Sequence, residues 1–170
     1  MKQVEIKEAM KFRHPEIVVL IVTKSKEGKI DITPLGWAML GSSNPNTWTI
    51  GVAKRHYSHK AILDSKEFTL CIPSYKQKDD VLYCGTVSGW NVDKLPNTKF
   101  NFLSAKNVST PLIEDSLACY ECKLIGKMPT SDHTIFLGEI MVAHISGKND
   151  GLINLGNKNL VKIKRGSKTK

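Results

Sequence analysis

The chain has 170 residues, of which 41% are hydrophobic and 24% charged, and it carries a net charge of +9. These values fit a globular domain and exclude a transmembrane helix, because the longest apolar run, Ile17–Val22, is too short to cross a bilayer. The N-terminus has no apolar signal core, so we expect a cytoplasmic protein without a membrane partner.

The positive charge indicates an anionic partner, and the distribution of this charge along the chain indicates which kind of anion to expect. We expect a domain at 1–150 and a basic, solvated and partly disordered extension at 151–170. No aromatic residues are interleaved among the charges of that extension, so we expect no nucleic-acid partner. For the positive charge in the rest of the chain, a small phosphate-bearing molecule is the better matching partner. The basic residues of the extension are Lys162, Lys164, Arg165, Lys168 and Lys170.

Strand patterns dominate the chain. The first segment is a continuous β-branched run, typical of a strand buried on both faces, and Gly28 marks a turn into the second. Alternation and β-branched content predict the others. The predicted strands are Ile17–Thr23, Lys29–Pro34, Trp48–Ala53, Phe68–Pro73, Leu117–Lys127 and Thr134–Ile145.

Two short helices interrupt the strands. The first is predicted over Ser58–Ser65 with Ser58 as its N-cap, and the second over Gln77–Thr86 with two acids in its first turn. A long irregular region, Ser88–Asp115, follows, and such regions are more often functional or interfacial than idle. Many strands without a βαβ rhythm predict a mainly β protein with a closed antiparallel barrel.

Four cysteines occur, and Cys119 and Cys122 form a C-x-x-C. The surrounding segment is predicted as a strand, in which residues three apart point to opposite faces. A redox pair normally needs a turn and a helix N-terminus, and a zinc site needs a second pair at a suitable spacing. We therefore interpret these cysteines as small core residues.

Several common chemistries lack their motifs. The sequence contains neither a G-x-G-x-x-G after a strand nor a P-loop, so neither type of nucleotide site is predicted. The histidines are scattered. Only His56 and His59 are close, and the predicted helix start at Ser58 separates them, so we predict no metal site.

The most informative stretch is Gly51–Ile62, in which a strand ends at Lys54 and Arg55 and leads into the helix at Ser58. A helix N-terminus offers unpaired N–H groups and a partial positive charge. Two cations and a hydroxyl beside it would form a phosphate pocket, in which Arg could clamp two oxygens. The alternative is a solvent-facing basic strand end, and spacing alone does not separate the two.

The segment before it, Ile32–Pro45, leaves a strand and enters a run of small residues. Gly36 and Gly41 allow close backbone approach to a flat ring, and Trp37 could pack on such a ring or in the core. Farther along, Gly85–Lys94 ends a helix and presents Ser88 and Trp90 as a rim of the same pocket, supplied by the same or a second subunit.

In these segments the sequence resembles the flavin reductase-like FMN-binding family, and the flavoredoxins within it. The resemblance is carried by ITPLGWAMLGSSNP, GVAKRHYSHKAI, CGTVSGWNVDK and SDHTIFLGEIMVAHI, in that order. It implies a split β-barrel that dimerises, with FMN near the subunit interface.

The resemblance also implies roles for individual residues. The isoalloxazine would be lined by Thr33, Pro34, Leu35, Gly36 and Trp37. The phosphate end would be contacted by Ser42, Ser43, Lys54, Arg55 and Ser58, with His56 beside them. Val87 and Ser88, at the end of the preceding helix, would border the flavin site. His133 is a candidate for contacting a reductant.

Two functions follow from the resemblance. The first is an oxidoreductase in which NAD(P)H passes hydride to the flavin; the protein then supplies position and electrostatics, and no general acid or base is required. The second is a flavoredoxin-type electron carrier that receives electrons from a redox protein, which the basic surface would steer. A flavin- or pyridoxal-phosphate-binding module without catalysis is the third interpretation.

Overall fold

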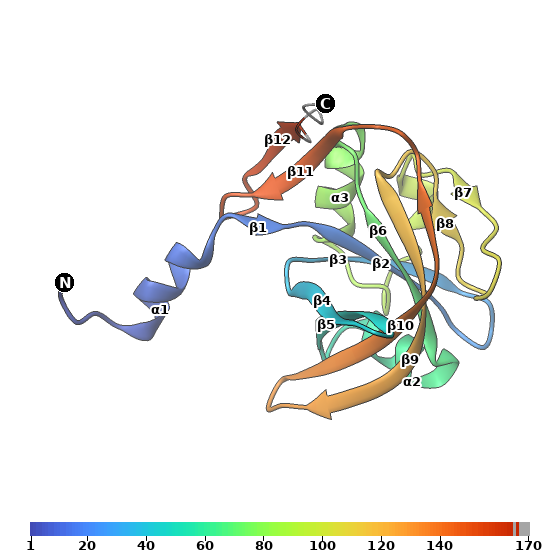
Figure 1. Cartoon of the computed structure of the whole chain (residues 1–170), viewed down its shortest axis with the longest axis horizontal. Coiled ribbons are helices and arrows are strands. Elements are labelled where there is room, and N and C mark those ends of the chain that lie inside the picture. The colour runs from blue at the N-terminus through green and yellow to red at the C-terminus, as the bar shows by residue number, and fades with distance from the viewer. Residues whose placement is uncertain (165, 167–170) are drawn as a thin grey trace.

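The structure is a computed structural model that describes residues 1–164 and residue 166. Its main element is an antiparallel sheet of seven strands in the order β3-β2-β6-β9-β10-β5-β4 (Figure 1). These strands are β2 (Val19–Lys24), β3 (Ile30–Leu35), β4 (Ala38–Ser43), β5 (Asn46–Ala53), β6 (Glu67–Ile72), β9 (Ala118–Pro129) and β10 (His133–Ile145).

The two outer strands of this sheet, β3 and β4, are consecutive in the chain, and only Gly36 and Trp37 separate them. The sheet must therefore bend round until one edge approaches the other at these two residues. At this connection the Glu16 carboxyl lies against the backbone of Gly36, and a Cβ at position 36 would collide with it.

Two smaller sheets complete the β-structure. One joins β1 (Glu16–Ile17), β11 (Asp150–Asn154) and β12 (Leu160–Lys164), and the other joins β7 (Phe102–Leu103) and β8 (Leu112–Ile113). In Figure 1, β11 and β12 lie beside β1, so segments from opposite ends of the sequence meet.

The helices are short. They are α1 (Ile6–Ala9), α2 (Tyr57–Ser65) and α3 (Lys78–Cys84), with 3-10 turns at Met10–Arg13, Tyr75–Gln77 and Leu95–Asn97. The N-terminal segment with α1 projects away from the body of the molecule (Figure 1). Within the described residues, no helix is long and apolar enough to span a membrane, and no three His, Cys, Asp or Glu side chains form a metal cluster.

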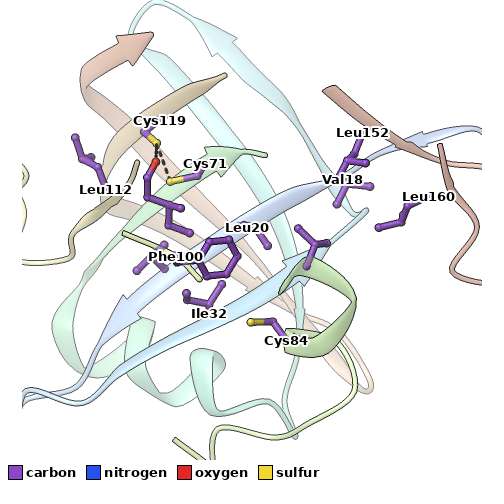
Figure 2. Close-up of a cluster of buried hydrophobic side chains, with 13 residues drawn as sticks. Val18, Leu20, Ile32, Cys71, Cys84, Phe100, Leu112, Cys119, Leu152 and Leu160 are labelled. Carbon is purple, nitrogen blue, oxygen red and sulfur yellow. Dashed lines mark hydrogen bonds between the residues drawn. The ribbon is translucent and has the colours of Figure 1, made fainter. Parts of the chain in front are cut away.

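Each face of the sheet covers its own hydrophobic core, and β2 belongs to both. Val18, Leu20 and Val22 pack in one cluster, whereas Val19 and Ile21 pack in the other. This is the consequence of a period of two along a strand. The first cluster is covered by α3, by the 99–117 region and by β11 and β12, and Figure 2 shows its side chains. The second cluster is covered by Ile62 of α2.

The predicted class and most predicted strands are confirmed. The protein is mainly β with short helices, and β2 is buried on both faces as its β-branched run indicated. Cys119 and Cys122 belong to different clusters, as predicted for residues three apart on a strand.

Other predictions differ from the structure. The N-cap of α2 is His56, so Ser58 is the second helical residue and its prediction as N-cap was wrong. The small-residue segment after Trp37 is a strand, β4, which pairs with β5. The second helical region divides into the 3-10 turn at Tyr75–Gln77 and α3, which ends at Gly85.

The expected solvated extension also differs. Residues 150–164 form β11, the connecting loop and β12, and Leu152 and Leu160 are buried in the first cluster. The expectation was wrong because it rested on the charge of the basic residues, whereas Leu152 and Leu160 point into the core. Of its basic residues, Arg165, Lys168 and Lys170 lie outside the described residues.

We predict that Leu160→Ala lowers the free energy of unfolding by about 2–5 kcal/mol, because it opens a cavity in the first cluster. Leu160 is 5% exposed, whereas Ile163 on the same strand is 43% exposed. The matched variant Ile163→Ala should therefore stay within about 0.5 kcal/mol of the parent. Denaturant unfolding measures both, and equal effects would mean that the strand does not contribute to the core.

Candidate functional site

A cavity of about 340 Å³ lies where β3, the turn before α2 and the end of α3 meet. This volume is in the range of small-molecule sites. The residues around it come from three separate parts of the chain. They are Asp31, Thr33, Pro34, Arg55, His56, Tyr57, Cys84, Gly85, Thr86, Val87, Ser88, Gly89 and Lys94.

A buried ion pair forms one wall of this cavity. The Lys94 Nζ lies 2.9 Å from Asp31 Oδ1, and the two side chains are only 3% and 2% exposed. The same ammonium donates a hydrogen bond of 2.6 Å to the carbonyl of Ile32, and the Thr33 hydroxyl donates one of 3.1 Å to Asp31 Oδ2. The pair therefore has the additional hydrogen bonds that a buried pair requires.

The ion pair fixes the loop of residues 85–94, which forms the cavity's outer wall. The Lys29 ammonium donates to the carbonyl of Gly89, and the Trp90 indole N–H donates to the carbonyl of Arg55 over 3.0 Å. A side chain at Gly89 would collide with the Asp31 carboxylate, so only glycine permits this approach. The 85–94 loop is thus attached both to β3 and to the turn before α2.

The opposite wall is cationic. The turn from Ala53 to His56 carries Arg55, and α2 begins directly after it; no side chain of the described residues caps its first N–H groups. Among the described residues no ion pair involves Arg55. A free guanidinium beside free helical N–H groups is an arrangement that binds phosphate.

His56 adds a polar group to this wall. Its Nδ1 is buried without a hydrogen-bond partner among the described residues. Burial lowers the pKa of His56, and the nearby charges of Arg55 and Lys94 lower it further. The imidazole is therefore neutral at pH 7, and its unpaired nitrogen fits a ligand that supplies a hydrogen-bond partner.

A second cavity of about 170 Å³ adjoins the first and shares Pro34 and Gly85 with it. Most of its lining is apolar and comes from Ile17, Val18, Leu35, Val81, Leu82 and Leu160. Residues 33–36 run from the first cavity to the second. The two together make a recess with a cationic end and an apolar end.

Beside this recess lies an aromatic pair. The rings of Trp37 and His133 stack with their centroids 4.6 Å apart, although 96 residues separate them in the chain. Asp132 Oδ1 lies 2.8 Å from His133 Nδ1 and orients the imidazole. Trp37 packs over Gly51 and remains 48% exposed, so the structure places it on the surface and not in a core.

The structure brings most of the sequence-predicted residues into or beside the recess. Six line the first cavity, namely Thr33, Pro34, Arg55, His56, Val87 and Ser88. Leu35 and Gly36 line the second cavity, and Trp37 stacks on His133.

Four predicted residues lie elsewhere. The Lys54 ammonium donates to the carbonyls of Thr130 and Ser131 over 2.6 and 2.9 Å, in the turn between β9 and β10. The shared turn sends the two adjacent cations in different directions, so only Arg55 reaches the cavity. Ser58 is fully buried inside α2, and its hydroxyl has no partner among the described residues.

Ser42 and Ser43 lie at the far end of the β4–β5 hairpin, where they pair with Thr47 and Asn46. At about 3.3 Å per residue, this end is roughly 25 Å from Arg55 along β5. Within one chain, these serines and the cationic wall are not brought together.

Sequence reasoning missed several lining residues, above all Asp31 and Lys94. Asp31 is an acid between two isoleucines of a predicted strand, and Lys94 is in the long irregular region that the sequence analysis expected to be functional or interfacial. A buried acid requires a partner of opposite charge, so Asp31 could have been identified from the sequence as one half of an ion pair. Nothing in the sequence indicated which lysine would supply it. Tyr57 and Cys84 also carried no signal beyond their helices.

Comparison with known proteins gives the family. Residues 11–163 match the model of the flavin reductase like domain. An uncharacterised protein of Archaeoglobus fulgidus is 28% identical over 148 residues, which is 86% of this chain and 82% of that protein.

Solved structures agree in fold. The FMN-binding protein of Thermus thermophilus with bound p-hydroxybenzaldehyde superposes with a TM-score of 0.86 at 19% identity, covering 98% of both chains. A flavoredoxin of Methanosarcina acetivorans gives 0.83 at 24% identity, covering 100% of this chain and 95% of that one. At these identities the likeness establishes the fold alone.

We predict that Lys94→Met lowers the free energy of unfolding by about 3–5 kcal/mol, because it leaves the Asp31 carboxylate buried and unpaired. The exposed lysine next along the loop provides a control, and Lys99→Met should stay within about 0.5 kcal/mol of the parent. Adding Asp31→Leu to Lys94→Met should recover part of the loss. Denaturant unfolding of the four proteins tests this, and equal losses for Lys94→Met and Lys99→Met would contradict it.

Proposed function

The chain belongs to the flavin reductase-like family, and on that basis we propose that it binds FMN in the recess and transfers hydride from NAD(P)H to the flavin. The observation that carries the proposal is the two-part recess, with unpaired cationic and polar groups at one end and apolar walls at the other. FMN has the same division between a phosphate and a flat ring.

The residues present fit the cofactor. Arg55, His56 and the first N–H groups of α2 would hold the phosphate, because each lacks a partner among the described residues. Residues 33–36 would follow the ring toward the apolar end. When bound, the flavin supplies the redox chemistry.

The protein's own side chains would orient the cofactor and shield it from solvent. The 85–94 loop closes one side of the recess, and the Asp31–Lys94 pair holds it there. His133 would meet a reductant from the open side, since Asp132 fixes its Nδ1 and Trp37 supports its ring. No proton transfer by a side chain is needed for hydride transfer, so the cavity's neutral His56 agrees with a binding role.

A second function is kept because of the flavoredoxin likeness. In it, bound FMN accepts electrons from a redox protein, and the +9 charge steers acidic partners to the surface. The same recess serves both functions, and only the electron source differs.

We also propose that the active form is a homodimer whose fold is a split β-barrel. Met39 and Leu40 of the edge strand β4 are 62% and 66% exposed, and Trp37 precedes them. A second copy would bury these side chains. The mass of the purified protein in solution tests the dimer: twice the mass of the chain would support it, and the mass of a single chain would contradict it.

We predict that Arg55→Ala weakens FMN binding at least about tenfold, because one charge-assisted contact to phosphate contributes about 1.5–3 kcal/mol. Riboflavin, which lacks the phosphate, should bind the variant nearly as well as the parent. Lys54→Ala is the matched control, since its ammonium contacts the β9–β10 turn, and it should leave both affinities unchanged. Fluorescence titration measures them. Equal losses for FMN and riboflavin would put the phosphate elsewhere.

For the source of electrons, we expect NADH or NADPH to bleach the flavin absorbance of the FMN-loaded protein under anaerobic conditions. Reduced ferredoxin is the comparison. Bleaching by ferredoxin with no response to either nucleotide would reject the reductase function and support the electron carrier. Bound flavin that neither donor reduces would reject both and leave a binding module.

A further inference from the structure

A row of three reactive side chains crosses the sheet away from the flavin recess. Cys71 of β6 pairs in register with Cys119 of β9, and Cys119 pairs in register with His144 of β10. Directly opposed residues of neighbouring strands project from the same face. The three side chains therefore lie side by side, although 48 residues separate the two cysteines.

The two sulfur atoms are in contact. Cys71 Sγ and Cys119 Sγ are 2.9 Å apart, and Figure 2 shows the side chains pointing toward each other. Opposed residues of antiparallel strands have Cα atoms about 4.5–5.5 Å apart. That spacing is within the range of disulfide-bonded cysteines. Both residues are free thiols in the structure.

The pair borders a cavity through Cys119. This cavity of about 270 Å³ is lined by Cys119, Ser116, His144 and Lys148, among others, and Cys71 is not part of its lining. Cys119 is 5% exposed and Cys71 is completely buried. A small reagent in this cavity meets Cys119 first, with Cys71 directly behind it.

The two thiols differ in their surroundings, and Cys119 is the more readily ionised of the pair. Contact with the Cys71 sulfur lowers the pKa of Cys119, whereas burial raises the pKa of Cys71. Ser116, His144 and Lys148 place polar groups in the cavity lining, and a buried carboxylate holds His144 in position. His144 Nε2 lies 2.7 Å from Glu121 Oε1, and the backbone N–H of Lys106 donates to the same oxygen over 2.9 Å.

We propose that Cys71 and Cys119 form a redox-active dithiol, which hydrogen peroxide entering the cavity beside His144 converts to a disulfide. The Cys119 thiolate attacks one peroxide oxygen, the O–O bond breaks, and the departing hydroxide takes a proton to become water. Cys71 sulfur then attacks the resulting sulfenic acid. The S–S bond forms, the S–O bond breaks, and the Cys71 proton leaves with the second water. Two thiols and one peroxide give one disulfide and two waters.

The remaining cysteines provide the contrast. Cys122 is on the same strand as Cys119 but on its other face, and burial raises its pKa to about 12. Burial likewise raises the pKa of Cys84 to about 12. Neither has a sulfur partner among the described residues, so both should stay reduced.

The test treats the reduced full-length chain with hydrogen peroxide, blocks the remaining thiols after denaturation, and maps the unreduced peptides by mass spectrometry. We expect one peptide pair linked through Cys71 and Cys119, with the other two cysteines alkylated, and dithiothreitol should reverse the link. In Cys71→Ser, the link should be absent and dimedone should capture a sulfenic acid on Cys119. Cys122→Ser should form the link as the parent does.

Two results would overturn the proposal. One is full alkylation of Cys71 and Cys119 after peroxide treatment of a chain whose circular dichroism is native. The other is a link that forms between different cysteines, between chains, or only after denaturation. Since this site shares no lining residue with the flavin recess, neither result bears on FMN binding.

Discussion

The ion pair between Asp31 and Lys94 is the constraint on which the recess depends. It joins the second strand of the chain's first hairpin to a loop more than sixty residues later. Its charges are buried, so either residue alone would be a strong liability, and both are satisfied only when the 85–94 loop is in place. The cavity wall is therefore formed or lost as a unit, which is what a cofactor site with fixed geometry requires.

The two-sided sheet explains how one small domain can hold two chemically different places. Each strand sends alternate residues to opposite cores, so the outer surface of each core is covered by different segments. The recess forms where α3 and the 85–94 loop cover one edge. Cys71, Cys119 and His144 lie on the central strands β6, β9 and β10, next to the 99–117 region. The distance between them follows from the width of the sheet and not from any separate domain.

Local patterns predicted the strands well, because alternation and β-branched content are properties of neighbouring residues. They failed where structure depends on distant partners. The lysines of β12 made this segment look solvated in the sequence, and its strand structure depends on pairing with β11. The adjacent cations Lys54 and Arg55 looked alike in sequence, yet only the position of the β9–β10 turn separates their roles. The family resemblance supplied the flavin, which no residue spacing could specify.

The cysteines also show that local sequence patterns do not identify partners on distant strands. Cys119 and Cys122 of the local C-x-x-C are core residues in different clusters, as predicted, and they are not neighbours. The relevant neighbour is Cys71, which only strand pairing identifies. A search confined to short motifs cannot find a cross-strand pair of this kind.

The pairing of Glu16 with Asn154 has a consequence for how the protein is made. A ribosome releases residue 16 long before residue 154, so β1 remains without its neighbour during most of synthesis. Asn154, Lys158 and Leu160 line the apolar end of the recess, which therefore does not exist on the nascent chain. The recess is therefore completed only after residue 160 has left the ribosome, and the unpaired edge of β1 is exposed to other chains until then.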